Sequence, residues 1–233
     1  MVQGTPDGWR GAAQVTDDHL ADRPADSQVP FFFHSYGQTH SGSAGSRAPD
    51  NRQEQFHDLL SQFVLQLTTH DATTPVGFLD QHIPLGGEWE KALKEALATC
   101  RVFVPVYSPQ YCVSTWCGME FDGFVRRQTE HRRSEPYTVS AIVPVLWTSP
   151  GRFTLPEAVQ PFQYDGPDLD QDYQLMGLRG LMEAGKWRVY RRTVWRIAER
   201  IVDVATAARL RPCDVSLFDD LRNVFAPRTQ GDS

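Results

Sequence analysis

The chain has 233 residues, 40% of them hydrophobic and 22% charged, which suits one sizeable domain with a buried core. Its formal net charge of −6 argues against a general nucleic-acid-binding protein, which would normally be basic. No stretch approaches the roughly 20 apolar residues that span a bilayer, and the N-terminus lacks a signal pattern. We therefore expect a cytoplasmic protein with neither a nucleic acid nor a membrane as partner.

The first third of the chain predicts a polar leader followed by alternating strands and helices. Residues 1–29 lack apolar periodicity and are interpreted as a disordered leader. The apolar run at 29–36 predicts a buried strand. Apolar residues then recur at helical spacing from Phe56 to Leu67, which predicts a helix with one buried face. Residues 76–80 predict a short second strand, and a loop containing Pro and Gly follows.

The same alternation continues through the middle of the chain. It predicts a one-faced helix over 89–100, a strand over 102–107, a loop over 108–115, a helix over 116–128 and a strand over 139–147. Basic residues cluster at 126–133 and at 188–200, and we interpret both clusters as solvated helix faces. Strands that alternate with helices at this spacing predict a parallel sheet covered by helices on both faces.

The C-terminal part is less readable. Residues 148–175 are rich in Pro, Asp and Gly and give no clear pattern, whereas a long final helix is predicted with Val194, Ile197 and Ile201 facing inward. The tail over 211–233 is interpreted as loose. The tail also contains apolar residues, which include Phe218 and Phe225. They allow the alternative that the tail docks against the domain.

Several common catalytic motifs are absent from the sequence. It contains no Gly-x-Gly-x-x-Gly after the first strand, no Walker-type Gly-Lys-Ser/Thr, no Gly-x-Ser-x-Gly and no His-Glu-x-x-His. Rossmann dehydrogenases, P-loop enzymes, α/β-hydrolases and zincins are therefore disfavoured. Cys112 and Cys117 lack a second pair that would complete a zinc site, so we expect no metal.

An ordered set of short segments is more informative than any single motif. In chain order the segments are His34-Ser35-Tyr36, Gly77-Phe78-Leu79-Asp80, Ser108-Pro109-Gln110-Tyr111 and Ser114-Thr115-Trp116-Cys117-Gly118-Met119-Glu120. Together with the later strand and helix, this order resembles the TIR family, bacterial type. The resemblance implies a flavodoxin-like three-layer α/β fold with a central parallel sheet over residues 30–210.

Enzymes of the TIR family cleave the bond between nicotinamide and ribose in NAD⁺, and their catalytic glutamate ends a Trp-x-x-x-Glu motif. The resemblance therefore implies that Glu120 is catalytic and that NAD⁺ is a substrate, with no cofactor. The chemistry suits a carboxylate, because loss of neutral nicotinamide leaves positive charge on the ribose. Trp116 precedes Glu120 by one helical turn and is expected on the same helix face, beside the sugar and base. Without the motif, Glu120 would be interpreted as a solvated helix residue.

The other candidate substrate-binding residues each have a structural alternative. Ser35 and Tyr36 end the first strand and either border the nucleotide pocket or fill the loop. Asp80 either orients the loop called BB or accepts hydrogen bonds from ribose hydroxyls, although Asp is common where strands end. Ser108 either faces the pocket or stabilises its own loop, and Trp116 is equally suited to the core.

TIR domains generally act by self-association, with the BB loop at the contact. The resemblance therefore implies Ile83 and Leu85 as interface residues, and a second copy or another TIR-containing protein as partner. The chain departs from many active TIR enzymes after the Ser-Tyr pair, where it has Gly37 and Gln38 in place of a basic residue.

Two functions follow from this resemblance. The first is an NAD⁺ glycohydrolase in bacterial defence or signalling, activated by self-association, which the Trp-x-x-x-Glu motif favours. The second is a non-catalytic TIR interaction or scaffold module, which Gly37 and the unusual C-terminal half favour. More loosely, Phe162-Gln163-Tyr164-Asp165 and the region after it are similar to the actinobacterial TIR-like FxsC proteins, which accompany a peptide-modification system.

Overall fold

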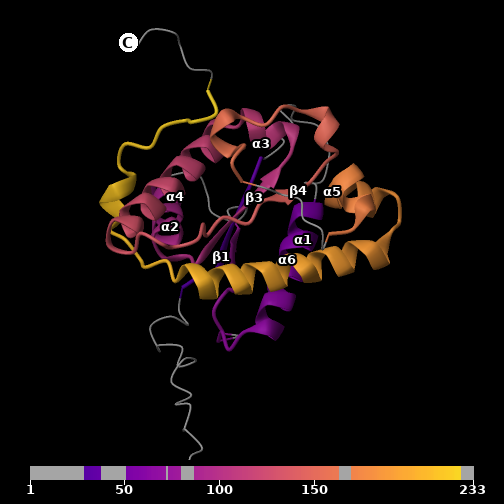
Figure 1. Ribbon diagram of the computed structural model, residues 1–233, viewed down its shortest axis with the longest axis horizontal. Coiled ribbons are helices and arrows are strands. Elements are labelled where there is room, and N and C mark those ends of the chain that lie inside the picture. Colours follow the sequence, from indigo (N-terminus) through magenta and orange to yellow (C-terminus); the bar gives the residue numbers. More distant parts are fainter. Residues whose placement is uncertain (1–28, 38–50, 72, 80–86, 163–168, 227–233) are drawn as a thin grey trace, which may run out of the picture.

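The fold is known from a computed structural model that describes residues 29–37, 51–71, 73–79, 87–162 and 169–226. At its centre lies a parallel sheet in the order β2-β1-β3-β4 (Figure 1). Its strands are β1 (Phe32–Tyr36), β2 (Gly77–Leu79), β3 (Val102–Tyr107) and β4 (Val145–Leu146). β1 and β3 are almost wholly buried, as expected for strands covered on both faces.

Successive side chains of each strand point to opposite faces of the sheet. Phe32 and Val104 belong to one apolar core, and Phe33 and Phe103 belong to the other. The register pairs Phe33 with Phe103, so their rings stack with centroids 5.5 Å apart. The same alternation directs Ser35 to the face that holds Phe33.

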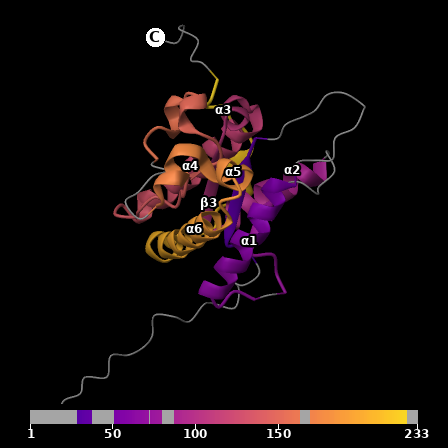
Figure 2. The same ribbon diagram turned by 90° about the vertical axis from the view of Figure 1, so that its right-hand side faces the viewer.

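Helices cover both faces of the sheet. On one side lie α1 (Arg52–Leu67), α5 (Gln171–Glu183) and α6 (Trp187–Ala208), with α1 and α6 side by side (Figure 2). On the other side lie α2 (Gly87–Thr99) and α4 (Thr115–Ser134) (Figure 1). The predicted three-layer α/β fold is therefore confirmed, with the strand order of flavodoxin-like sheets. Within the described ranges, no helix is long and apolar enough to cross a membrane.

The loop predicted over 108–115 contains a helix, so that prediction is wrong in part. Ser108 caps α3 (Pro109–Val113), because its side chain accepts a hydrogen bond from Tyr111 N at 3.1 Å. Pro109 follows the cap at a position where its missing N–H costs nothing. A single turn has no apolar periodicity, so these two local features were its only signal in the sequence.

β4 is shorter than the predicted strand over 139–147. The residues of β3 that bond toward β4 are Phe103, Pro105 and Tyr107, and Pro105 has no N–H to donate, so Ile142 forms only an isolated bridge with Phe103. Two short 3₁₀ helices follow β4, namely η3 (Pro150–Arg152) and η4 (Glu157–Val159). They lie in the region 148–175, for which the sequence predicts no secondary structure.

α5 changes direction at Gly177, whose φ is +70°. A β-carbon at this position would lie 2.6 Å from the Trp147 carbonyl oxygen. Glycine therefore serves two needs at once, a left-handed backbone and a close approach to the end of β4.

The C-terminal segment 213–226 packs against α2 and α4 (yellow in Figure 1). It contains η5 (Val215–Phe218), and Phe218 is buried between the two helices. The Arg222 N–H donates to Asp122 Oδ2 at 2.9 Å, and Arg126 pairs with Asp220. For these residues the structure shows the docked alternative; residues 227–233 lie outside the described ranges.

Two histidines connect β1 to α1. His34 Nε2 lies 3.2 Å from Gln53 Oε1, and His34 Nδ1 lies 3.3 Å from His57 Nδ1. Because the Gln53 oxygen can only accept, His34 carries its proton on Nε2, and His57 Nδ1–H then donates to His34 Nδ1. This network requires the His34 ring to be neutral, because its Nδ1 has to accept. Burial lowers the pKa of His34 well below its usual range and lowers that of His57 to about 4.

These lowered pKa values predict that acid destabilises the fold. Between the usual pKa of His57, 6.5, and its folded value of about 4, the unfolded chain binds a proton that the folded chain does not. The unfolding free energy therefore falls as pH falls through this window, by about 3 kcal/mol for His57. Urea unfolding at pH 7.5 and pH 4.5 measures the loss. A His57→Gln variant should lose less stability over the same interval, and an unchanged loss would contradict the assignment.

Candidate functional site

The site predicted from the sequence centres on a hydrogen bond between β1 and α4. Ser35 Oγ donates to Glu120 Oε2 at 2.5 Å, although the two residues are 85 positions apart. Ser35 reaches this partner because strand alternation directs it to the face covered by α4. Glu120 is only 4% exposed, so its carboxylate lies in the protein and not on a solvated helix surface. The structure thus brings two of the predicted site residues into direct contact.

The start of α4 is fixed by a second serine cap. Ser114 ends α3, and its side chain accepts a hydrogen bond from Cys117 N at 3.2 Å. This places Glu120 in the second turn of α4, directed toward the end of β1. The two serine caps explain why α3 and α4 meet at the carboxyl edge of the sheet.

Ser108 lies at this edge too, at the end of β3, and is buried. Its hydroxyl already accepts the capping bond from Tyr111 N. The structure therefore shows the loop-stabilising alternative for Ser108. A contact between Ser108 and a substrate stays a prediction.

Gly37 follows Tyr36, at the position where the basic residue implied by the resemblance is absent. A β-carbon at Gly37 would lie 2.3 Å from Tyr111 N and 2.4 Å from the Gln110 carbonyl carbon. The first turn of α3 thus packs directly on the backbone at the end of β1. Any side chain here would push α3 away, so the absence of a basic residue has a packing reason.

Tyr36 and Trp116 are the more accessible of the predicted residues. Tyr36 is half-buried at the end of β1, and its ring contacts that of His34 with centroids 5.5 Å apart. Trp116 lies one turn before Glu120 and is 47% exposed, which argues against a core role. Val113, at the end of α3, is exposed as well. An aromatic ring is thus available to solvent near the buried carboxylate.

Three predicted residues lie outside the described ranges. They are Asp80, predicted to bind substrate, and Ile83 and Leu85, predicted to form an interface. Their roles stay predictions.

Tyr111 belongs to this edge but was not among the predicted site residues. Its ring is fully buried and contacts those of Tyr107 and Phe225, with centroids 5.6 and 5.3 Å away. Burial raises the pKa of its hydroxyl well above the usual range, and the Glu120 carboxylate adds to the rise, whereas Ser35 opposes it. Tyr111 therefore faces the Ser35–Glu120 pair. The sequence offered only its place in the Ser-Pro-x-Tyr segment.

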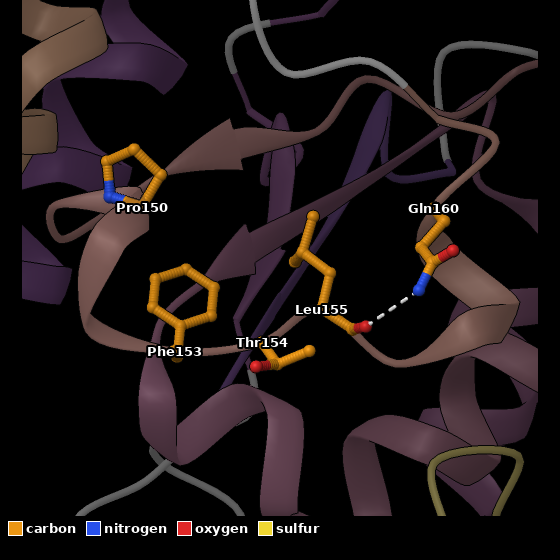
Figure 3. Close-up of a pocket in the computed structure, with 5 residues that line it drawn as sticks. All are labelled: Pro150, Phe153, Thr154, Leu155 and Gln160. Carbon is orange, nitrogen blue, oxygen red and sulfur yellow. Dashed lines mark hydrogen bonds between the residues drawn. The ribbon is translucent and has the colours of Figure 1, made fainter.

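A cavity of about 290 Å³ lies beyond the carboxyl end of β4 (Figure 3). Its lining residues are Pro150, Phe153, Thr154, Leu155 and Gln160. Gln160 Nε2 donates to the Leu155 carbonyl at 3.2 Å, which closes one side of the hollow (Figure 3). The same loop continues to Phe162, whose ring contacts that of Phe121, the residue after Glu120. The loop that lines the cavity thus contacts the helix that carries Glu120.

No metal-binding group is present in the part of the chain that the structure describes: no three His, Cys, Asp or Glu side chains come together there in a suitable arrangement. Cys112 and Cys117 are buried and form no disulfide, and burial raises the pKa of Cys112 to about 11. A thiol with so high a pKa is a poor nucleophile near neutral pH. Among the described residues at this edge, Glu120 is the best-placed group for chemistry.

One comparison with known proteins identifies a family. A family model described as TIR domain matches residues 53–178, which is more than half of the chain. The matched region contains Ser108, Trp116 and Glu120, whereas Ser35 and Tyr36 precede it. No solved structure matches the chain.

Proposed function

Because the chain belongs to the TIR domain family, we propose that it cleaves NAD⁺ between nicotinamide and ribose, with Glu120 as the catalytic residue. Activation by self-association is part of the proposal, as is a role in bacterial defence or signalling. TIR domains function in signalling or in NAD⁺ cleavage and associate with themselves or with other TIR proteins.

The hydrogen bond between Ser35 and Glu120 carries this proposal. A glutamate without a specific role on a helix surface would be solvated. Glu120 is instead buried, and its carboxylate accepts a 2.5 Å hydrogen bond from Ser35 at the end of β1. In parallel α/β sheets, ligands bind outside the carboxyl ends of the strands, next to the point where the strand order reverses. That point lies between β1 and β3, and Ser35 is on β1.

The proposed chemistry needs only one carboxylate. Nicotinamide leaves as a neutral molecule, so no acid has to protonate it, and positive charge develops on the ribosyl carbon. A fixed anion beside the ribose stabilises that charge more than it stabilises the ground state. Water then bonds to the ribosyl carbon, which gives ADP-ribose and a proton. Ser35 holds one oxygen of that carboxylate in place.

The burial of Glu120 also supports a second candidate, a non-catalytic TIR interaction module. A carboxylate that is 4% exposed must become accessible before it can meet a ribose. Self-association is the step that we expect to open the site. A protein that never opens it acts only as a scaffold.

The two candidates are separated by an assay of nicotinamide release from NAD⁺ by the full chain over a wide range of protein concentrations. We expect release whose rate per protein molecule rises with concentration, because assembly is proposed to activate the enzyme. Absence of release at every concentration, with a macromolecular crowding agent present as well, would leave the scaffold as the function.

A further inference from the structure

Tyr111 is held rigidly beside the Ser35–Glu120 pair. Its backbone N–H donates to Ser108 Oγ at 3.1 Å, and the backbone at Gly37 packs against the same turn of α3. Its ring is fixed between that of Tyr107 on β3 and that of Phe225 in the C-terminal segment. Three separate parts of the chain therefore determine where its hydroxyl lies.

That hydroxyl is buried but makes no hydrogen bond of normal geometry with any residue that the structure describes. Ser35 is nevertheless close enough to lower the pKa of Tyr111, and Glu120 is close enough to raise it. Leaving a buried donor unpaired destabilises a folded protein. Phenylalanine would fill the same space without that cost, so fold stability does not explain the hydroxyl.

We propose that Tyr111 is a positioning residue for Glu120: in the reacting complex its hydroxyl donates to Ser35 Oγ, whose own proton is already donated to Glu120 Oε2. The resulting series of hydrogen bonds, from Tyr111 through Ser35 to Glu120, holds the carboxylate in one orientation beside the ribose. This inference rests on the proposed NAD⁺ cleavage, because it assigns Tyr111 a role in that reaction.

The chain of hydrogen bonds has a direct consequence for the Tyr111→Phe variant. The Tyr111→Phe variant keeps the ring contacts and loses only the hydroxyl. We therefore expect its kcat to fall about tenfold and its KM to stay within about twofold of the wild-type value. Thermal stability should stay the same or rise, since an unpaired buried donor has been removed. The acid limb of the rate–pH profile should move to higher pH, because an ionised carboxylate loses support from its donors.

Tyr190→Phe is the matched control. Tyr190 on α6 is also buried, and its hydroxyl also lacks a hydrogen-bond partner among the described residues, but it lies in the core on the opposite face of the sheet. We expect its kcat to equal that of the wild type. A fall like that of Tyr111→Phe would show that any buried hydroxyl has this effect, and would overturn the positioning role.

A double variant tests whether Tyr111 acts through Ser35. In a Ser35→Ala background, Tyr111→Phe should cause no further fall in kcat, since residues that act as a unit are not additive. If the two substitutions each lower kcat and their effects multiply, the proposed series of hydrogen bonds is overturned. A Tyr111→Phe enzyme as fast as the wild type would overturn it too. If the wild type releases no nicotinamide, the proposed function fails, and the role of Tyr111 in that reaction fails with it. Release by the wild type with an unaffected variant overturns Tyr111 alone.

Discussion

Replacement of Glu120 by glutamine is expected to slow nicotinamide release by about 10²- to 10³-fold, the usual cost of removing one electrostatic contact to a transition state. Glutamine has the same shape, and its oxygen can still accept the hydrogen bond from Ser35 Oγ. What the variant loses is the negative charge beside the developing cation. The rate of release at saturating NAD⁺, compared with that of the wild type, measures the effect.

Two controls make this result interpretable. Glu130→Gln changes an exposed glutamate of the same helix, which pairs with Arg133, and its rate should stay within about twofold of the wild type. Urea unfolding of Glu120→Gln should give a transition like that of the wild type, so that a slow rate reports chemistry and not a damaged fold. A Glu120→Gln enzyme that retained a third or more of the activity would remove Glu120 from its assigned role.

Replacement of Arg127 by methionine is expected to lower the unfolding free energy by about 3 kcal/mol. Arg127 is 1% exposed and donates to three carbonyl oxygens, those of Leu97 and Cys100 at 2.7 Å and that of Arg211 at 3.0 Å. Leu97 lies in the last turn of α2, where carbonyls have no partner within the helix. Methionine fills similar space but donates to none of the three. Removing the cost of burying the cation offsets part of that loss.

Arg132→Met on the same helix is the matched control for Arg127→Met. Arg132 is exposed, so its replacement should change the unfolding free energy by less than about 0.5 kcal/mol. Urea unfolding followed by tryptophan fluorescence measures both variants. Equal stabilities for the two would contradict the capping role of Arg127.

Arg127 also shows where reading the sequence falls short. The basic cluster at 126–133 was interpreted as one solvated helix face, and for Arg127 that prediction is wrong. Helical periodicity places a residue on a face, but it does not say whether a cation there meets water or carbonyls from distant segments. The carbonyls of α2 and of Arg211 reach Arg127 only after the chain has folded.

The C-terminal segment was undecided in the sequence for a similar reason. Its apolar residues allowed both a loose tail and a docked one. A β-carbon at Gly118 would lie 2.0 Å from Asn223 Oδ1, and Gly123 similarly leaves room for Leu221 and Phe218. Two glycines of α4 thus leave the space that these side chains of the segment occupy. Whether the segment is loose or docked depends on that fit, which cannot be predicted from the local sequence.

By itself the sequence determined the class of fold and the residue to test first. Burial of one apolar face requires helical or alternating periodicity, and that requirement is written in the local order of residues. The order of short segments then singled out Glu120. Only the tertiary structure decided its surroundings: the hydrogen bond from Ser35, the close approach of α3 at Gly37 and the hydroxyl of Tyr111. These contacts join residues that are far apart in the chain, so their geometry exists only once the sheet and its helices have packed together.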